Sequence, residues 1–321
     1  MKHLLSIEKM APEDLEWILA ETTNMKASRG RSQDLPLTGQ TWAMIFTKSS
    51  TRTRVSFEVG IRELGGWVMF LSKNDIQMGR GEPIEDTARV LGRMVHGAVI
   101  RTFAQKDVED FAQYSNIPTI NALTDAEHPC QILTDLFTIQ EKLGTYRNKI
   151  VTFVGDGACN VPASWIFAAA KLGFEFRIAA PKEFQPLLSL LERAGFNHVQ
   201  SQSGAKGEII RANLPSTGAR IVLTPDCVDA ATGADVLYTD TLVSMGKEAE
   251  AAGRIEALKD YQINANLLKV AQPAAIVMHC LPAYRGKEID AETFEAHADT
   301  IFDQAENRLH TQKTILKWLV S

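Results

Sequence analysis

Eight residues near the start of the chain combine hydroxyl groups with positive charge. They read Thr47-Lys48-Ser49-Ser50-Thr51-Arg52-Thr53-Arg54 and stand between a predicted strand, residues 41–46, and a predicted helix, residues 52–64. The N–H groups at a helix start attract anions, and guanidinium groups bind phosphate or carboxylate through two parallel hydrogen bonds. An ordinary helix cap by Ser50 or Thr51, followed by a solvated basic turn, is the alternative. The pattern favours an anion site.

Three single residues next to other predicted elements could also act on a substrate. Asp240 follows predicted strand 236–239, and its carboxylate could pair with a cationic amine. Cys280 follows predicted strand 275–278, and its thiol could move a proton or accept a hydrogen bond, as its neighbours decide. His128 precedes Pro129, which suits the first position of a helix and would aim the ring at a ligand. Taken singly, a histidine is more often structural and a cysteine more often a small buried hydrophobe.

Short apolar runs alternate with amphipathic stretches along most of the chain, and these elements must position the candidates. The expected strands are residues 41–46, 67–71, 98–102, 119–121, 150–154, 175–179, 220–223, 236–239, 275–278 and 300–302. The expected helices are residues 52–64, 85–95, 106–115, 129–142, 162–172, 183–194 and 306–320. This alternation favours right-handed βαβ units with parallel sheets covered on both faces. Ligands bind such sheets at the carboxyl ends of the strands, where the candidate loops begin.

The length and composition predict two domains. A chain of 321 residues exceeds the usual single core, and the polar, turn-rich residues 144–149 are the expected junction. We therefore predict an α/β protein with two doubly wound domains, residues 1–143 and 144–305, each with a central parallel sheet flanked by helices. With 45% hydrophobic and 23% charged residues, the composition excludes a disordered chain. The net charge of −5 gives no general reason to bind nucleic acid or an anionic membrane.

Three further features predict a cytoplasmic protein. No run approaches the roughly 18–20 apolar residues that a membrane span needs. Acidic residues soon follow the short apolar patch at the N-terminus, which is not typical of a secretion signal. The four cysteines, Cys130, Cys159, Cys227 and Cys280, have no CxxC spacing and suit a reducing compartment.

Two other functions have some support in the residues. Gly155 and Gly157 follow a predicted strand and precede a helix, as in a dinucleotide-binding dehydrogenase, but the third glycine of that fingerprint is replaced by Asn160. A metal could be held by His128, Cys130, His279 and Cys280. Adjacent side chains of an extended segment point in opposite directions, so His279 and Cys280 would not easily share one ion. We expect no metal site.

Four motifs occur in a fixed order along the chain. They are Ser50-Thr51-Arg52-Thr53-Arg54, His128-Pro129-Cys130-Gln131, Asp240 followed by Ser244-Met245-Gly246, and His279-Cys280-Leu281-Pro282. In this combination the chain resembles the aspartate and ornithine transcarbamylase superfamily, and the last two motifs resemble its ornithine branch. The resemblance implies transfer of a carbamoyl group from carbamoyl phosphate to the δ-amine of L-ornithine, giving L-citrulline and phosphate in arginine biosynthesis. A carbamoyltransferase for putrescine, or for another diamine or amino acid, is the alternative. No cofactor is implied.

The resemblance also assigns residues to carbamoyl phosphate. The phosphate would be held at the start of the first predicted helix and by Arg101, the carbonyl oxygen by Thr53, Arg101 and His128, and the carbamoyl amide by Gln131. Gln77 would reach the site of a neighbouring subunit, and residues 306–321 would pack back on the first domain and bring Arg308 to the site. The implied set is Ser50, Thr51, Arg52, Thr53, Gln77, Arg101, His128, Gln131, Cys280, Leu281 and Arg308.

For ornithine, the resemblance places Asp240 at the δ-amine and Asn160, Ser244 and Met245 at the α-amino acid end. The implied catalytic residues are Cys280, usually treated as the proton acceptor, together with Asp240, His128 and Arg101. Residues 242–253 would form a lid that closes over ornithine and excludes water. Cys159 stands where many relatives have an asparagine, a departure that bears on substrate selectivity rather than on the reaction. The resemblance further implies a homotrimer with active sites shared between subunits.

Overall fold

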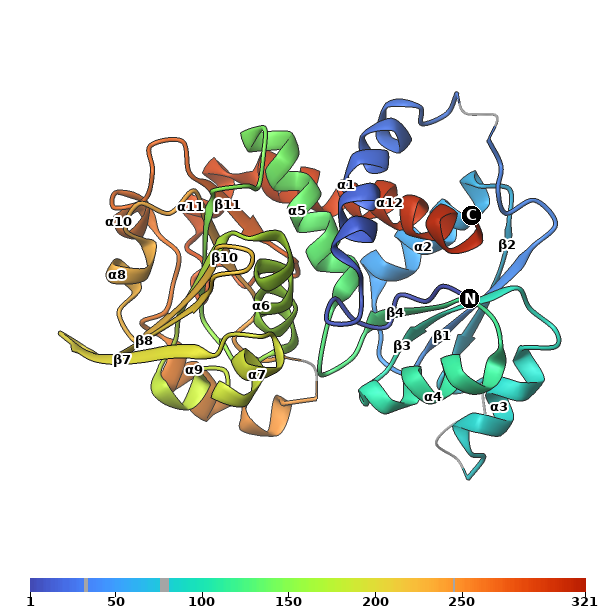
Figure 1. The fold of residues 1–321 in the computed structure, drawn as a ribbon, viewed down its shortest axis with the longest axis horizontal. Helices are drawn as coiled ribbons and strands as arrows, with labels where there is room; N and C mark the ends of the chain where they lie inside the picture. The colour runs from blue at the N-terminus through green and yellow to red at the C-terminus, as the bar shows by residue number, and fades with distance from the viewer. Residues whose placement is uncertain (32–33, 76–80, 245) are drawn as a thin grey trace. The chain divides into compact units, whose positions relative to one another are not determined.

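The computed structural model describes residues 1–31, 34–75, 81–244 and 246–321. The chain divides into two compact units, residues 1–137 with 306–321, and residues 138–305. The unit boundaries fall within two helices, α5 (Pro129–Leu143) and α12 (Ala298–Val320), whereas the expected junction follows α5. Each unit has a sheet with parallel strands and flanking helices, as the alternation of apolar and amphipathic segments predicts (Figure 1).

The first unit contains a four-stranded parallel sheet with the order β2-β1-β3-β4. Its strands are β1 (Thr41–Phe46), β2 (Trp67–Ser72), β3 (Gly97–Arg101) and β4 (Thr119–Leu123), and its helices include α1 (Pro12–Ala27), α2 (Thr51–Glu63), α3 (Ile84–Leu91) and α4 (Gln105–Ser115). Ala43 and Ile45 of β1 pack with Val108 and Phe111 of α4 in one apolar cluster. The alternate residues Trp42 and Met44 are buried as well. Burial on both faces is what a parallel strand with helices on each side requires.

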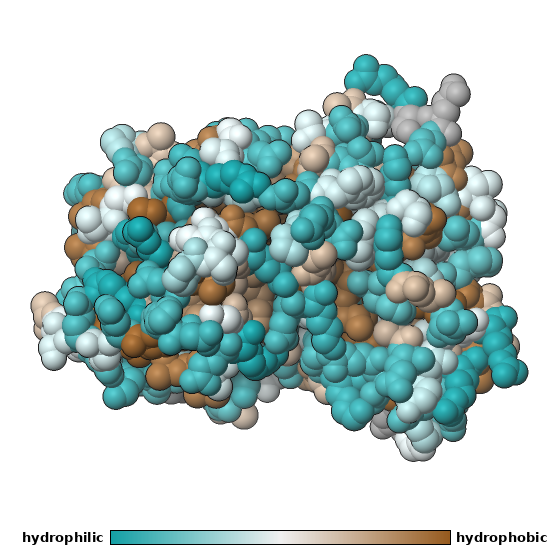
Figure 2. Space-filling model, viewed as in Figure 1, coloured by the Kyte–Doolittle hydropathy of each residue, from teal (hydrophilic) through white to brown (hydrophobic). Residues whose placement is uncertain are grey.

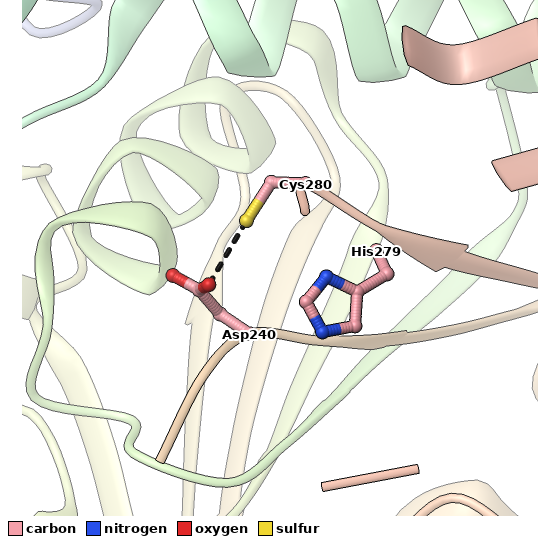
Figure 3. Close-up of side chains that lie close together, drawn as sticks. All are labelled: Asp240, His279 and Cys280. Atoms are coloured by element: carbon pink, nitrogen blue, oxygen red, sulfur yellow. Dashed lines mark hydrogen bonds between the residues drawn. The ribbon is translucent and has the colours of Figure 1, made fainter. Parts of the chain in front are cut away.

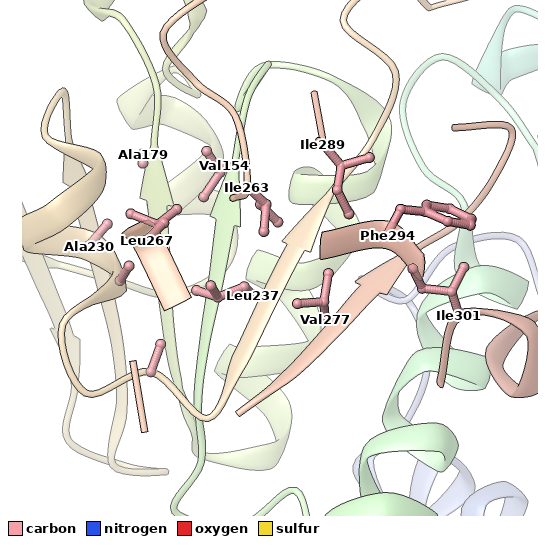
Figure 4. Packing of buried hydrophobic residues seen from close by; sticks show 12 residues of the cluster. Val154, Ala179, Ala230, Leu237, Ile263, Leu267, Val277, Ile289, Phe294 and Ile301 are labelled. Atoms are coloured by element: carbon pink, nitrogen blue, oxygen red, sulfur yellow. The ribbon is translucent and has the colours of Figure 1, made fainter. Parts of the chain in front are cut away.

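The second unit contains a seven-stranded sheet with the order β11-β10-β5-β6-β9-β8-β7. The five parallel strands are β5 (Ile150–Val154), β6 (Glu175–Ala179), β9 (Ala219–Thr224), β10 (Val236–Thr239) and β11 (Ile276–His279). The hairpin of β7 (His198–Gly204) and β8 (Gly207–Leu214) adds antiparallel strands at one edge. Figure 4 shows Leu237 and Val277 on neighbouring strands, packed in a cluster that also contains Phe294 and Ile301.

Helices connect the strands of the second unit. They are α6 (Asn160–Leu172), α7 (Leu188–Arg193), α8 (Cys227–Ala231), α9 (Ala251–Leu258), α10 (Ala265–Leu268) and α11 (Ala291–Ala296), with short 3₁₀ turns η1 (Lys182–Phe184) and η2 (Glu248–Glu250). The sequence pattern does not predict α1 or α8 to α11, most of which are short.

Each sheet reverses its strand order at one point, and the reversal marks the ligand-binding edge. In the first unit the chain passes from β1 to β2 on one side and returns to β3 on the other side of β1. In the second unit β6 and β10 lie on opposite sides of β5. Ligands of open α/β sheets bind outside the carboxyl ends of strands at such reversal points. The loops after β1 and β3, and those after β5 and β10, are therefore where the two sites belong.

Two predicted elements are wrong, and two observed strands are absent from the prediction. The strand predicted at residues 300–302 is wrong, because these residues lie in the first turns of α12, where Ile301 is buried and Phe302 is exposed. The single helix predicted at residues 183–194 is wrong as well, because Pro186 lies between η1 and α7 and cannot continue the hydrogen bonding of a helix. Strands β7 and β8 are absent from the prediction, because the side chains of β7 are largely polar and exposed and do not alternate with apolar ones.

Hydrophilic residues predominate on the face drawn in Figure 2, with small apolar groups between them. Within the described residues, no helix combines the length and apolar character needed to cross a bilayer.

Candidate functional site

The start of α2, where the sequence predicts an anion site, follows the end of β1. Ser50 is the N-cap residue in an extended conformation, and its Oγ accepts a hydrogen bond from the N–H of Thr53 at 3.3 Å. Thr51 is exposed, Arg52 is half-buried and Thr53 is fully buried. Several N–H groups of the first helical turn have no partner within the helix, and they carry the positive end of its dipole. This end of α2 is therefore suited to bind an anion.

A hollow of about 490 Å³ lies beside the same loop. Its lining includes Ser50 and Thr51 at the helix start and Lys73 beyond the end of β2. Arg54 also lines it and lies over the ring of Phe70, with the guanidinium carbon 3.6 Å from the ring centre. Three cationic residues, Lys48, Arg54 and Lys73, and several hydroxyl-bearing residues thus line one space at the carboxyl ends of β1 and β2.

Arg308, from α12, lies at the same place in the first unit. Its Nη2 donates a hydrogen bond of 2.6 Å to Oγ1 of Thr53, and its side chain is buried. Arg101 ends β3 and is also buried, with an exposed fraction of 5%. Two buried guanidinium groups near a helix start concentrate positive charge and hydrogen-bond donors there, which favours binding of an anion.

His128 precedes α5 and lies in the field of both arginines. Burial holds the pKa of its imidazole well below the usual 6.5, and the positive charges of Arg308 and Arg101 lower that pKa further. The ring is therefore neutral near pH 7 and can donate one hydrogen bond without adding charge. Gln131 follows one turn later, and its Nε2 donates to Asp135 Oδ1 at 2.8 Å. Among the described residues, Gln131 Oε1 is buried and has no hydrogen-bond partner.

The second unit brings Asp240 and Cys280 together. Asp240 follows β10 and Cys280 follows the neighbouring strand β11, so the parallel pairing of the strands places both at the same edge. The Cys280 Sγ donates a hydrogen bond of 3.0 Å to Asp240 Oδ1, as Figure 3 shows. Cys280 has an exposed fraction of 9%, and Asp240 is half-buried. A carboxylate and a thiol thus share one edge of the sheet.

His279 lies closer to this pair than the sequence predicts. Single ligand atoms of Asp240, His279 and Cys280 all lie within 4.8 Å of one another. The prediction that the side chains of His279 and Cys280 point in opposite directions is therefore wrong, because β11 ends at His279 and Cys280 lies beyond the extended strand. Both ring nitrogens of His279 are engaged, Nδ1 by the N–H of Leu281 at 2.8 Å and Nε2 by Glu288 Oε1 at 3.3 Å. The ring is therefore occupied by the protein rather than presented to an ion.

The turn between β5 and α6 supplies Asp156, Cys159 and Asn160. Burial raises the pKa of the Asp156 carboxyl, Asp240 adds to this rise and the Arg254 guanidinium opposes it. Removal of the Cys159 thiol from water raises its pKa well above the usual 9, and the charges of Asp156 and Asp240 raise it further. Cys159 is the N-cap residue of α6 and makes no side-chain cap bond, and Asn160 is the first helical residue.

The remaining predicted residues are placed as follows. Ser244 is half-buried in the segment before η2, and Leu281 is half-buried after Cys280. Gln77 and Met245 lie outside the described residues. Sequence reasoning missed Asp156, Arg254 and Glu288 as partners of the site. Asp156 could have been found, because it follows a buried strand at a point where the strand order reverses.

The chain is similar to known proteins along most of its length. Residues 2–141 match the family model "Aspartate/ornithine carbamoyltransferase, carbamoyl-P binding domain", and residues 147–319 match "Aspartate/ornithine carbamoyltransferase, Asp/Orn binding domain". An ornithine carbamoyltransferase of Akkermansia muciniphila is 50% identical over 99% of this chain and 98% of its own. One of Sulfurovum sp. is 46% identical over 99% of both chains.

Solved structures are similar along the whole chain. The anabolic ornithine carbamoyltransferase of Campylobacter jejuni has a TM-score of 0.89 at 41% identity, covering 99% of each chain. The ornithine carbamoyltransferase of Pyrococcus furiosus has a TM-score of 0.89 at 40% identity, covering 99% of this chain and 97% of its own. This chain therefore belongs to the aspartate/ornithine carbamoyltransferase family.

Proposed function

We propose that the protein transfers the carbamoyl group of carbamoyl phosphate to the δ-amine of L-ornithine, giving L-citrulline and phosphate. The observation that carries the choice of amine is the Cys280–Asp240 pair, whose carboxylate and thiol lie 3.0 Å apart at the ends of β11 and β10. An anionic group at this edge suits a cationic amine and not the carboxylate of aspartate. The relatives above, which are named ornithine carbamoyltransferases, support the same choice rather than the diamine alternative.

Carbamoyl phosphate binds the first unit in this proposal. The phosphate lies at the start of α2, held by the N–H groups and hydroxyls of Ser50, Thr51 and Thr53 and by the guanidiniums of Arg52, Arg101 and Arg308. The carbonyl oxygen accepts hydrogen bonds from Thr53, Arg101 and neutral His128, which stabilise the negative charge that develops on it. Gln131 Oε1, buried and without a partner among the described residues, accepts from the carbamoyl amide. The resemblance to the carbamoyltransferases also assigns Cys280 and Leu281 to this substrate.

Ornithine binds the second unit. Asp240 orients the δ-amine, while Asn160, Ser244 and Met245 bind the α-amino and α-carboxylate groups. The amine nitrogen attacks the carbamoyl carbon, the bond from that carbon to the phosphate oxygen breaks, and phosphate leaves with the electron pair. The cationic amine first gives up one proton to become a nucleophile, and its nitrogen loses a second proton as the new C–N bond forms. The hydrogen-bonded pair of Asp240 and Cys280 accepts one of these protons, and the leaving phosphate takes the other. The reaction requires no cofactor or metal.

We further propose a homotrimer in which Gln77 of one subunit reaches the site of the next. An apolar patch on the first unit supports an assembly: Trp67 and Met69 of the edge strand β2 are 69% and 45% exposed, and Val55 of α2 is 55% exposed. Exposed apolar groups on an edge strand mark a surface that another chain covers. A cytoplasmic role in arginine biosynthesis is our proposal as well. The anabolic relative supports this role, and so do the four cysteines, among which the structure has no disulfide.

One assay tests the choice of substrate. Purified protein is supplied with carbamoyl phosphate and, in parallel, with ornithine, putrescine, N-acetylornithine or aspartate, and carbamoylated product and phosphate are measured. We expect the highest kcat/KM with ornithine. A higher kcat/KM with putrescine, or turnover only with aspartate, would contradict the proposal.

A further inference from the structure

A single arginine, Arg254, contacts several elements around residues 242–254, which we call the Ser244 segment. Arg254 lies on α9, and its Nη2 forms a close ion pair with Asp156 Oδ2. The two side chains are only 12% and 7% exposed. The same guanidinium donates from Nε to the carbonyl oxygen of Leu242 at 3.3 Å and lies 4.9 Å from the centre of the Phe184 ring. One buried cation therefore contacts three segments of the second unit.

These contacts close the Ser244 segment into a loop. Leu242 stands at its beginning, two residues before Ser244, and Arg254 stands at its end. A bond from Arg254 Nη1 to Glu250 Oε2, at 3.5 Å, adds a contact within the segment. The hydrogen bond between Arg254 and the carbonyl oxygen of Leu242 joins the two ends of the segment directly, so the loss of the guanidinium separates them.

The other partner shapes the turn that follows β5. Asp156 Oδ1 accepts a hydrogen bond of 3.1 Å from the N–H of Ala158, so one carboxylate binds the turn and the arginine at once. The turn is tightly packed, since a Cβ on Gly157 would lie 2.5 Å from Ile178 Cγ2 and 2.9 Å from the carbonyl oxygen of Phe184. Asn160 begins α6 four residues after Asp156. The position of Asn160 therefore depends on the same carboxylate.

From these contacts we infer that Asp156 and Arg254 form a positioning pair, which holds the Ser244 segment against the turn that carries Asn160. The inference rests on the proposed function, in which Ser244 and Asn160 bind the α-amino acid end of ornithine. Neither member of the pair is placed on a substrate atom. Both members act through the backbone segments that carry Ser244 and Asn160, the residues placed on ornithine.

The pair also controls the charge beside the proposed amine site. Asp156 and Asp240 follow the neighbouring strands β5 and β10 and interact electrostatically. With Arg254 in place, the charge of Asp156 is balanced and Asp240 supplies the negative charge for the amine. Without Arg254, the carboxylate of Asp156 is a second buried anion beside Asp240. It then competes with Asp240 for the cationic amine of the substrate or takes up a proton.

The test compares Arg254→Gln, Arg254→Lys, Asp156→Asn and the double variant with wild type, by steady-state kinetics and by limited proteolysis without ligands. For Arg254→Gln we expect the KM for ornithine to rise about tenfold or more, while the KM for carbamoyl phosphate changes less than about twofold. In the ligand-free protein, cleavage within residues 242–254 becomes several-fold faster. Arg254→Lys restores part of both effects. The double variant is less impaired than Arg254→Gln, because it removes the unbalanced carboxylate.

Arg177→Gln is the matched control. Arg177 lies on β6 of the same unit, pairs with Glu175 at 2.6 Å and donates to the carbonyl oxygens of Ala230 and Thr232, but contacts no part of the Ser244 segment in these bonds. The inference is wrong if Arg254→Gln and Asp156→Asn affect the ornithine KM and the cleavage rate no more than Arg177→Gln does. If wild type makes no citrulline, the proposed function fails, while the cleavage of the ligand-free protein still decides whether the pair holds the segment.

Discussion

Arg308 donates a hydrogen bond of 2.6 Å to Thr53, a residue 255 positions earlier in the chain. Thr53 lies in the first turn of α2 and Arg308 in the part of α12 that belongs to the first unit. Both side chains are buried, with exposed fractions of 0% and 3%. The terminal helix thus completes the cradle that begins at the end of β1, and its guanidinium supports the hydroxyl proposed to face the carbamoyl oxygen.

Replacing Arg308 by lysine tests this support. Lysine keeps the charge but lacks the planar fork that binds Thr53 and an anion together. We expect kcat/KM for carbamoyl phosphate to fall by about 100-fold, as for the loss of a preorganised donor. Lys313→Gln is the control, because Lys313 is buried on the same helix and pairs with Glu63 at 2.7 Å. An equal loss of kcat/KM in both variants would show that Arg308 serves stability alone.

Replacing Asp240 by asparagine separates the two substrates. The amide keeps the size of the side chain but removes the charge that pairs with the amine and the strong acceptor of the Cys280 thiol. We expect kcat/KM for ornithine to fall about 100-fold or more, while the KM for carbamoyl phosphate changes little. Steady-state kinetics with each substrate varied in turn measures both. A rise in the KM for carbamoyl phosphate as large as that for ornithine would argue against the assignment of Asp240 to the amine.

The sequence correctly predicts those elements whose conformation depends mainly on residues close together in the chain. The buried strands β1 and β10 are continuous apolar runs, and the candidates that follow them lie at strand ends, where the fold places ligands. The contact of Asp156 with Arg254 spans 98 positions and depends on how β5 and α9 pack, so no sequence spacing indicates it. The proximity of the His279 and Cys280 side chains depends on the end of β11 at His279, and the ends of elements are what sequence patterns predict least accurately. Residues 300–302 favour a strand by composition, and the tertiary fold of α12 overrides that preference.

Closure of residues 242–253 over ornithine predicts a change in protease sensitivity. Within this segment η2 is followed directly by α9, which begins at Ala251, so Gly253 lies within a helix rather than in an open loop. We expect cleavage of this segment to slow when carbamoyl phosphate and a non-reactive ornithine analogue are both present. Mass spectrometry of the fragments locates the cut. An unchanged cleavage rate with both ligands bound would contradict a lid.

The lowered pKa of His128 predicts a loss of stability in weak acid. Its imidazole titrates near 6.5 in the unfolded chain and well below that value in the fold. Between these two pKa values the unfolded state binds the extra proton, so the contribution of His128 is fully present above pH 6.5 and falls as the pH drops, by at most about 1.4 kcal/mol per pH unit. We expect His128→Gln to flatten the decline in urea midpoint between pH 7 and pH 5.

A second histidine provides the comparison for that experiment. Burial also lowers the pKa of His297, which lies just after α11 and outside the proposed site. His297 is only half-buried and has no arginine named among the causes of its shift. His297→Gln should therefore flatten the pH dependence less than His128→Gln does. Equal slopes in His128→Gln and wild type would mean that His128 takes up its proton in the fold as readily as in the unfolded chain.

The N-cap position of α6, occupied by Cys159, allows a test of helix capping by substitution. It occupies the N-cap position of α6, with an extended backbone at φ −86° and ψ 176°, and its side chain makes no cap hydrogen bond. Asparagine and serine are among the best N-cap residues, since their side-chain oxygen accepts from an N–H of the first turn. We expect Cys159→Asn and Cys159→Ser to raise the free energy of unfolding by about 1 kcal/mol relative to Cys159→Ala. Urea denaturation monitored by circular dichroism measures the difference. If alanine proves as stable as asparagine, the turn that Asp156 already holds leaves no N–H of α6 for the new side chain to bind.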